Sequence, residues 1–279
     1  MYQLELGTSV KLFWKGALNP DYRQQLKEIK RLGFQSVEVS MGQVGGYKLT
    51  MEMATQVAPE ALQAVLDEGL IINSVHMPFH RFVYISSCDE GVRAWASDEY
   101  RKLMEACNPF KPRNFVFHSK VGRDEEGLVE ARKPALIKTF REIVACTDSN
   151  VCIENMNATS YPNTIDRMLE VLQQVENGKC CIDINHSLYN KPEDMIVALA
   201  PWLRTIHVSD NDGTNEKHWM PNTGVIDWMK ILGALEKIGY QGAFTYEVLA
   251  DPDGRLYSFA EIRENYDQLF EEYNKYRSR

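Results

Sequence analysis

The sequence predicts an α/β protein built as a single (β/α)8 barrel of the TIM type over residues 1–279, and three observations indicate it. Short apolar runs alternate eight times with segments of helical periodicity, which is the pattern of parallel strands connected by helices. The length of 279 residues is close to the roughly 250 that such a barrel takes. No change of composition and no low-complexity linker divides the chain, so we expect one domain.

The predicted strands are short apolar runs, each bounded by polar or turn-forming residues. The first is interrupted at Gly7. In chain order the predicted strands are residues 4–12, 36–39, 71–75, 115–117, 151–153, a run that ends at Asp183, a run that ends at His207, and residues 243–246.

The predicted helices begin at residues that favour helix N-termini, such as Asn19-Pro20-Asp21 and Asn163-Thr164. Glycines are placed to end several of them, because glycine readily adopts the left-handed conformation that follows a helix. In chain order the predicted helices are residues 20–31, 59–67, 92–106, 128–146, 165–175, a short helix after Pro192, and residues 227–237 and 259–273.

The overall composition narrows the class of protein. The net charge of −8 gives no electrostatic reason to favour nucleic acid as a partner, since phosphate binding requires a basic face. The mean hydropathy of −0.37, without a long apolar run, argues against a membrane span, and the N-terminal residues do not resemble a signal peptide. The six cysteines form no CxxC pair, so we expect reduced thiols and a cytoplasmic protein.

Metal-ligand residue types end six consecutive predicted strands. Because the carboxyl ends of barrel strands face one mouth, these side chains are expected to converge on one site. Five of the six histidines lie at these ends or in the adjoining loops, whereas structural loop histidines would be scattered. The strand-end residues are His76, His118, Glu154, Asp183, His207 and Glu247, and the loops add His186, Glu216 and His218.

This residue set suits a divalent cation. Carboxylate and imidazole ligands without thiolate are typical of zinc, manganese or cobalt sites. We expect Cys152 and Cys181 to point away from the mouth, into packing. Asp210, three residues after His207, is a candidate to orient that imidazole, and a loop-capping role is the alternative. Glu38 either reaches the site as a supporting acid or stays at the barrel rim.

The strand endings also resemble a known family. The segments VHMPF, FHSK, IENM, IDINHS, IHVSDNDG, KHWMPNTGVIDW and TYEV are similar to those of the xylose isomerase-like TIM barrel superfamily, also described as AP endonuclease family 2. The resemblance covers nearly the whole chain and is strongest from Glu154 to Glu247. The superfamily contains sugar isomerases and epimerases, relatives of inosose isomerase and dehydratase, and the endonuclease IV class of abasic-site nucleases.

The resemblance to the epimerase branch implies specific roles. One divalent metal is held there by four residues, which correspond to Glu154, Asp183, His207 and Glu247, and the two glutamates also move protons. His186, in the D-x-x-H pattern, corresponds to a substrate contact. The implied reaction is isomerisation or epimerisation of a sugar, polyol or keto-sugar through an enediolate. The expected cofactor is one zinc, manganese or cobalt ion, with up to three possible.

The sequence departs from the ketose 3-epimerases in one respect. Those enzymes carry an arginine soon after the strand-seven histidine, whereas this chain reads SDNDG from Ser209. Lys120 is a candidate replacement for binding the substrate, and Lys217 is the alternative. Trp14 and Trp219 are candidates for an apolar wall against the sugar, with core packing or loop anchoring as the alternative.

The resemblance to endonuclease IV implies an alternative function. That class holds three zinc ions, and its additional ligands correspond to His76, His118, His186 and the pair Glu216 and His218. The pair reads E-x-H where that class has D-x-H, which leaves the third ion in doubt. The alternative is therefore a multi-zinc phosphoester hydrolase. A barrel that binds a polyol without catalysis is a third hypothesis. A homodimer is compatible with a barrel of this size.

Overall fold

Eight parallel strands close into one barrel in the computed structural model, which describes residues 1–278 except 15–16, 45–49, 81–83, 121–127 and 158–159. The strand order around the barrel is β1-β12-β11-β10-β9-β8-β6-β4, so strands that follow one another in the chain are neighbours. The barrel strands are β1 (Glu5–Lys11), β4 (Ser36–Ser40), β6 (Ile71–His76), β8 (Asn114–Phe117), β9 (Asn150–Glu154), β10 (Lys179–Asp183), β11 (Leu203–Val208) and β12 (Ala243–Tyr246). The predicted (β/α)8 barrel is thereby confirmed.

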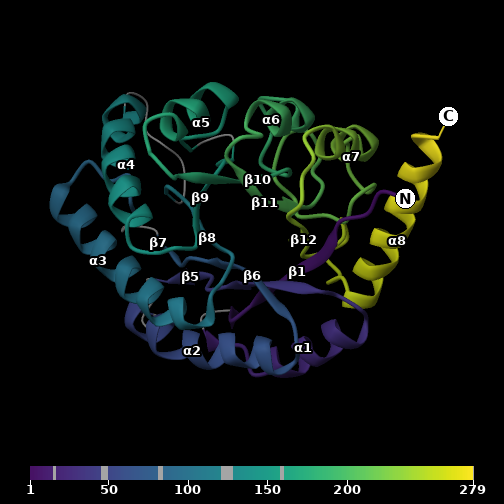
Figure 1. The fold of residues 1–279 in the computed structure, drawn as a ribbon, viewed down its shortest axis with the longest axis horizontal. Helices are drawn as coiled ribbons and strands as arrows, with labels where there is room; N and C mark the ends of the chain where they lie inside the picture. The colour runs from purple at the N-terminus through teal and green to yellow at the C-terminus, as the bar shows by residue number, and fades with distance from the viewer. Residues whose placement is uncertain (15–16, 45–49, 81–83, 121–127, 158–159, 279) are drawn as a thin grey trace.

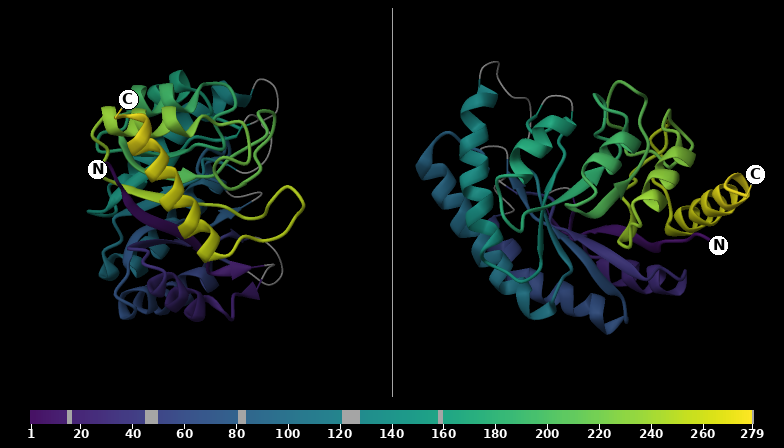
Figure 2. Two further views of the ribbon diagram at one scale, coloured as in Figure 1. Left: turned by 90° about the vertical axis from the view of Figure 1, so that its right-hand side faces the viewer. Right: turned by 45° about the horizontal axis from the view of Figure 1, so that its top comes forward.

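The described helices form a ring outside the barrel (Figure 1; Figure 2). They are α1 (Tyr22–Arg31), α2 (Met51–Asp67), α3 (Glu90–Cys107), α4 (Leu128–Val144), α5 (Ile165–Leu172), α6 (Pro192–Ala198), α7 (Trp228–Lys237) and α8 (Phe259–Tyr276), with a short 3-10 helix η1 (Asn108–Phe110). The two chain ends lie side by side, where the Tyr2 amide donates to Asn274 Oδ1 at 2.7 Å. Among the residues that the structure describes, no helix is both long and apolar enough to cross a membrane.

One helix starts earlier than the sequence predicts. Helix α2 begins at Met51, eight residues before Pro59, because Thr50 caps it by accepting a hydrogen bond from the Met53 amide. Pro59 lies inside the helix, where it removes one backbone hydrogen bond. The buried face runs on both sides of it, so tertiary packing outweighs the local cost of the proline. The other helix ends differ from prediction by a few residues.

Two short strand pairs near the mouth were not predicted. The hairpin of β2 (Phe13–Trp14) and β3 (Ala17–Leu18) follows β1, and β5 (Gln43–Val44) pairs in parallel with β7 (Phe79–His80). These two-residue strands are too short to leave a periodic pattern in the sequence.

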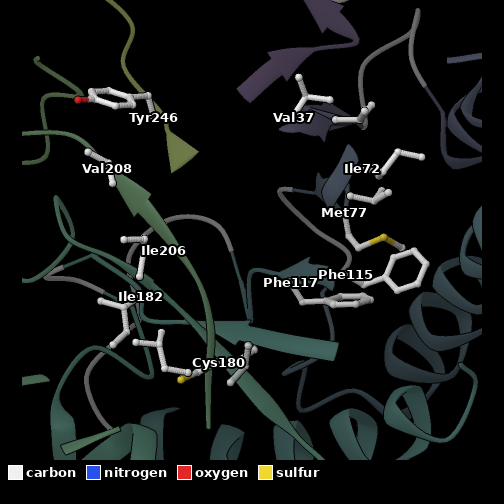
Figure 3. Packing of buried hydrophobic residues seen from close by; sticks show 14 of the residues in the cluster. Val37, Ile72, Met77, Phe115, Phe117, Cys180, Ile182, Ile206, Val208 and Tyr246 are labelled. Atoms are coloured by element: carbon white, nitrogen blue, oxygen red, sulfur yellow. The ribbon is translucent and has the colours of Figure 1, made fainter. Parts of the chain in front are cut away.

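Alternation along the strands separates two packing regions. The main core lies between barrel and helices, and Figure 3 shows part of it, with Ile182 and Ile206 on neighbouring strands and Phe115 and Phe117 on β8. The barrel interior holds a separate small apolar cluster of Val116, Cys152 and Cys181.

The rest of the interior is polar. Asn73 Nδ2 donates to Thr205 Oγ1 and to Thr245 Oγ1, each at 3.1 Å, which links three barrel strands. The interior beneath the mouth is therefore suited to support charged groups.

Candidate metal centre

A cavity of about 460 Å³ opens at the carboxyl end of the barrel strands. Its polar wall comes from residues that end or follow the strands, among them Lys11, His76, Glu154, Asp183 and Glu247. Its apolar wall comes from Phe13, Phe79, Met156 and Leu249. A cavity of this size and mixed lining is typical of a small-molecule site.

Four side chains bring one ligand atom each to within 4.8 Å of one another: Glu154, Asp183, His207 and Glu247. The strand register explains the convergence, because Asp183 pairs with His207, and His207 pairs with the residue two before Glu247. His207 Nδ1 lies 3.0 Å from Glu247 Oε2 and 3.4 Å from Glu154 Oε1. Residues nearly a hundred positions apart thus meet at one point.

The donors in this group fit a divalent cation. Both oxygens of Glu154, Oδ2 of Asp183 and Nδ1 of His207 are buried, and they have no hydrogen-bond partner in the described part of the chain. Three carboxylates held this close repel one another unless a positive charge lies between them. Oxygen and imidazole nitrogen donors are ligands that zinc, manganese and cobalt accept.

Cys181 lies closer to this group than we expected. It packs with Val116 and Cys152 in the barrel interior, in agreement with a packing role, yet its Sγ is within 4.8 Å of ligand atoms of Glu154 and His207. Burial raises the pKa of the Cys181 thiol well above its ordinary value, so it stays protonated at neutral pH.

Glu154 also faces a second group of possible ligands. His76 Nε2 and His118 Nε2 lie 3.3 Å and 3.2 Å from Glu154 Oε2, and the two imidazole rings meet edge to face. His76 Nδ1 is 3.0 Å from the Met77 carbonyl oxygen, which leaves Nε2 to face the carboxylate. One oxygen of Glu154 thus faces these two histidines, and the other faces His207.

A third group consists of His186, Glu216 and His218. His186 Nε2 lies 3.2 Å from Glu216 Oε2 and 3.4 Å from Asp183 Oδ2, while its Nδ1 is 2.9 Å from the Asn155 carbonyl oxygen. His218 Nδ1 is 2.9 Å from the carbonyl oxygen of Glu247. Main-chain oxygens therefore orient both imidazoles, as is usual around metal-binding histidines.

The charges of these groups shift their pKa values in opposite directions. Burial alone would raise the pKa of Glu154, but His118 and His207 hold it well below its ordinary value. Burial disfavours the charged form of His76, yet the Glu154 carboxylate beside it and the nearby Glu38 and Glu247 raise its pKa to about 9. The hydrogen bond from His186 lowers the pKa of Glu216 to about 2. At neutral pH these two carboxylates are thus ionised, the state that a cation requires.

Asp183 and His186 are a coupled pair. Burial raises the pKa of Asp183, and the charge of His186 opposes that shift. Burial likewise disfavours the charged form of His186, but Asp183, Glu216 and Glu154 raise the pKa of the imidazole to about 10. Without a cation, protons on the histidines therefore balance the carboxylates.

Two of the expected substrate contacts, Lys120 and Trp219, lie away from the cavity. Lys120 is buried, with its ammonium 5.9 Å from the Tyr84 ring centroid, and Trp219 packs beneath Lys217. Neither is among the described residues that line the cavity. Trp14 belongs to β2, and its side chain lies outside the described residues. Loop conformation decided these positions, and spacing in the sequence does not encode it.

Asp210 does not orient His207, contrary to our expectation. Its carboxylate accepts hydrogen bonds from the amides of Asn222 and Ile226 and from Trp228 Nε1, so it holds the loop, which was the alternative reading.

The residue that contacts His207 from below is Glu38, which we had considered either a supporting acid or a rim residue. His207 Nε2 lies 2.9 Å from Glu38 Oε2, and both side chains are fully buried.

Lys11 and Asn185 were missed in the sequence. Lys11 ends β1 and lines the cavity, and its position at the end of a predicted strand could have identified it. Asn185 Oδ1 accepts a hydrogen bond from the Lys217 amide at 2.9 Å, which ties the β10 end to the loop that carries Glu216 and His218. Its place inside the D-x-x-H pattern was the available signal.

Comparisons with known proteins agree with the barrel fold. A family described as xylose isomerase-like TIM barrel matches residues 26–271. No curated protein matches the chain by sequence.

Several solved structures share the fold. D-allulose 3-epimerase from Methylomonas sp., in complex with D-allulose, superposes with a TM-score of 0.77 at 15% identity and covers 97% of each chain. D-psicose 3-epimerase with D-tagatose from Clostridium cellulolyticum H10 gives 0.70 at 17% identity, over 98% of this chain and 99% of that one. A xylose isomerase domain protein from Planctomyces limnophilus gives 0.67 at 15% identity, over 98% and 97%.

Proposed function

Because the chain belongs to the xylose isomerase-like TIM barrel family, we propose that it is a divalent-metal-dependent isomerase or epimerase of a sugar, polyol or keto-sugar. The observation that carries the proposal is the group of Glu154, Asp183, His207 and Glu247 at one point of the cavity. Two of the structures with the same fold are named as 3-epimerases and are described with the sugars D-allulose and D-tagatose. We extend that substrate class to this chain as part of the proposal.

The proposed cofactor is one zinc, manganese or cobalt ion, held by Glu154, Asp183, His207 and Glu247. A bound divalent cation supplies polarisation of a substrate carbonyl and its neighbouring hydroxyl, which acidifies the C–H bond between them. The buried ligand atoms without hydrogen-bond partners support this assignment.

The two glutamates carry the proton transfers in this proposal. One carboxylate removes the proton from the carbon beside the substrate carbonyl, which leaves an enediolate. The other, which first takes up a proton from solvent water, returns it from the opposite face or to the neighbouring carbon. Although burial opposes ionisation, nearby imidazoles hold the pKa values of Glu154 and Glu247 below their ordinary range, so both carboxylates can accept a proton at neutral pH.

The remaining lining orients the substrate. His186 presents its Nε2 side toward Asp183 and Glu216 at the cavity, where it can hydrogen-bond a substrate hydroxyl. Phe13 and Phe79 offer apolar surface to the carbon chain and reduce access of water.

The test combines solvent-deuterium uptake with variants of equal size. Purified enzyme is incubated with candidate ketoses in heavy water, and deuterium at the carbon beside the carbonyl is followed by NMR. We expect Glu154→Gln and Glu247→Gln to lower turnover by at least about 100-fold, the contribution typical of general acid–base groups. Glu216→Gln is the matched control, since this carboxylate lies in the same cavity outside the four-residue group. Full turnover of either Glu154→Gln or Glu247→Gln would contradict the mechanism.

A second candidate function is a multi-zinc phosphoester hydrolase resembling endonuclease IV. It is supported by the two further ligand groups, one around His76, His118 and Glu154 and the other around His186, Glu216 and His218. Two or three ions would activate a hydroxide and clamp a phosphate. Against nucleic acid as substrate, the net charge is −8, and Lys11 is the single lysine or arginine among the described cavity-lining residues.

Metal counting separates the two candidates. Elemental analysis of protein purified without chelator is expected to give about one ion per chain for the isomerase, lost in Asp183→Ala. Two or three zinc ions, with activity on abasic DNA or small phosphate esters, would favour the hydrolase. His76→Ala is expected to be mild in the first case and severe in the second, because His76 belongs to a different ligand group. No bound metal at all would leave the binding barrel without catalysis.

The proposal also covers the cellular location, domain organisation and assembly of the enzyme. We place it in the cytoplasm as one domain over residues 1–279, in keeping with six free cysteines. A homodimer is the assembly to test, by light scattering on the purified protein.

A further inference from the structure

His207 is held between the candidate metal centre and a buried acid. Its Nδ1 faces Glu154 and Glu247, at 3.4 Å and 3.0 Å, and its Nε2 faces Glu38 Oε2 at 2.9 Å. Because the two ring nitrogens point in opposite directions, Nδ1 alone can bind a cation in the cavity. The proton of a neutral His207 must then reside on Nε2.

The Glu38 carboxylate is placed to accept a hydrogen bond from that Nε2–H group. Its Oε2 also accepts a hydrogen bond from Ser74 Oγ at 2.7 Å, so this oxygen has two donors. Strand register places Ser9 and Ser74 on either side of Glu38, in neighbouring strands β1 and β6. A fully buried carboxylate is costly unless it is paired, and here Oε2 has the imidazole and a hydroxyl as partners, whereas Oε1 has no hydrogen-bond partner among the described residues.

The other group beneath His207 cannot take this role. The Cys181 thiol lies near the ring, but a thiol is only a weak hydrogen-bonding group, and this one packs with Val116 and Cys152. The loop acid Asp210 is occupied by Trp228 and by loop amides.

We propose that Glu38 is a positioning residue for the metal centre, which fixes His207 with its proton on Nε2 and its lone pair on Nδ1 toward the cation. The hydrogen bond also makes the imidazole a stronger donor to a metal. Glu38 does not touch the cavity itself, since it is absent from the described lining residues. The inference rests on the proposed metal-dependent function and adds the residue that sets the metal affinity of the site.

The test measures zinc affinity on metal-stripped protein by competition with a chromophoric chelator. Glu38→Gln keeps the shape of the side chain but removes its charge, and we expect the affinity to fall about 10- to 100-fold, the range found when a partner of a metal-binding histidine is removed. Ser74→Ala leaves the carboxylate in place but removes one of its donors, so we expect a smaller loss.

Asn114→Ala is the matched control for damage to the barrel interior. Asn114 is also buried on a barrel strand, but its hydrogen bonds run to Asn73, Asn150 and Cys152. We expect this variant to lower Tm and leave zinc affinity unchanged.

A second readout follows the proton directly. In zinc-loaded protein with labelled histidine, the wild type is expected to show a slowly exchanging, downfield Nε2–H signal for His207, and Glu38→Gln is expected to lose or shift it. Wild-type affinity together with an unchanged signal in Glu38→Gln would overturn the inference. Failure of the wild type to bind any divalent cation would instead overturn the proposed function, so the two failures are distinguishable.

Discussion

Glu154 belongs to two of the three possible ligand groups described above. Its Oε1 lies 3.4 Å from His207 Nδ1, while its Oε2 lies within 3.3 Å of His76 and His118. A carboxylate placed in this way can hold one ion alone or bridge two, because each oxygen faces a different set of imidazoles. In the proposed metal centre, the histidines around Glu154 would decide whether this carboxylate holds one ion or bridges two, since it can serve either arrangement.

The raised pKa of His76 predicts how the metal-free protein responds to pH. Its pKa is about 9 in the folded state against 6.5 ordinarily, so its contribution to stability is full below about pH 6.5 and is lost as pH rises through 9. We expect the Tm of chelator-treated protein to fall from pH 7 to pH 10, and to fall less in His76→Gln. A Tm independent of pH in this window would show that the imidazole does not hold its proton more tightly after folding.

The loop between β11 and α7 supplies two residues of the candidate site, and its conformation was not predicted from the sequence. Residues 209–227 carry Glu216 and His218, and Asp210 anchors the loop from a fully buried position. The chain is closely packed there, because a Cβ on Gly224 would clash with the Asn211 carbonyl oxygen. The Asp210 carboxylate and the hydrogen bond from the Lys217 amide to Asn185 Oδ1 hold the loop in place.

Removal of the anchor should loosen this element. Asp210→Ala leaves the amides of Asn222 and Ile226 and the indole of Trp228 without their acceptor, so we expect a loss of about 3 kcal/mol or more in urea unfolding. Asp212→Ala, in the same loop, removes contacts to the exposed Thr214 and Asn215 and an ion pair with the half-buried Lys217, and serves as the control, with an expected loss below about 1 kcal/mol. Equal losses in the two variants would contradict the anchoring role.

The closed barrel makes the candidate metal site a property of the whole molecule. The proposed ligands come from β9, β10 and β11 and from the residue after β12, and those strands are held in register by their neighbours around the ring. An unfolded chain cannot present these groups together, so the proposed cation would bind the folded state alone and stabilise it.

Divalent metal should therefore raise Tm. At a free ion concentration about 100 times the Kd, the stabilisation is about 2.7 kcal/mol, which corresponds to roughly 5–10 °C for a chain of this size. Differential scanning fluorimetry with zinc, manganese and cobalt, against chelator, measures the shift. Asp183→Ala is expected to abolish it, and an unchanged Tm with all three ions would argue against a cation at this site.

The strand order and the convergence of ligand types were readable in the sequence because both follow from local patterns. Apolar runs ended by Asp, Glu or His mark the strand ends, and parallel closure brings those ends to one mouth whatever the loops do. The sequence predicted the start of α5 correctly, because Thr164 caps that helix. It did not predict the start of α2, because residues buried on both sides of Pro59 carry the helix through a proline, which usually interrupts one.

The tertiary structure alone decided which side chains complete the site. Asp210 lies three residues from His207 yet turns into its own loop, whereas Glu38, at a distance of 169 residues in the chain, meets the imidazole across the barrel interior. Lys120 packs on Tyr84 while Lys11 reaches the cavity. Strand alternation and closure are short-range rules that residues carry individually, but the direction of a loop side chain depends on long-range packing that no local pattern records.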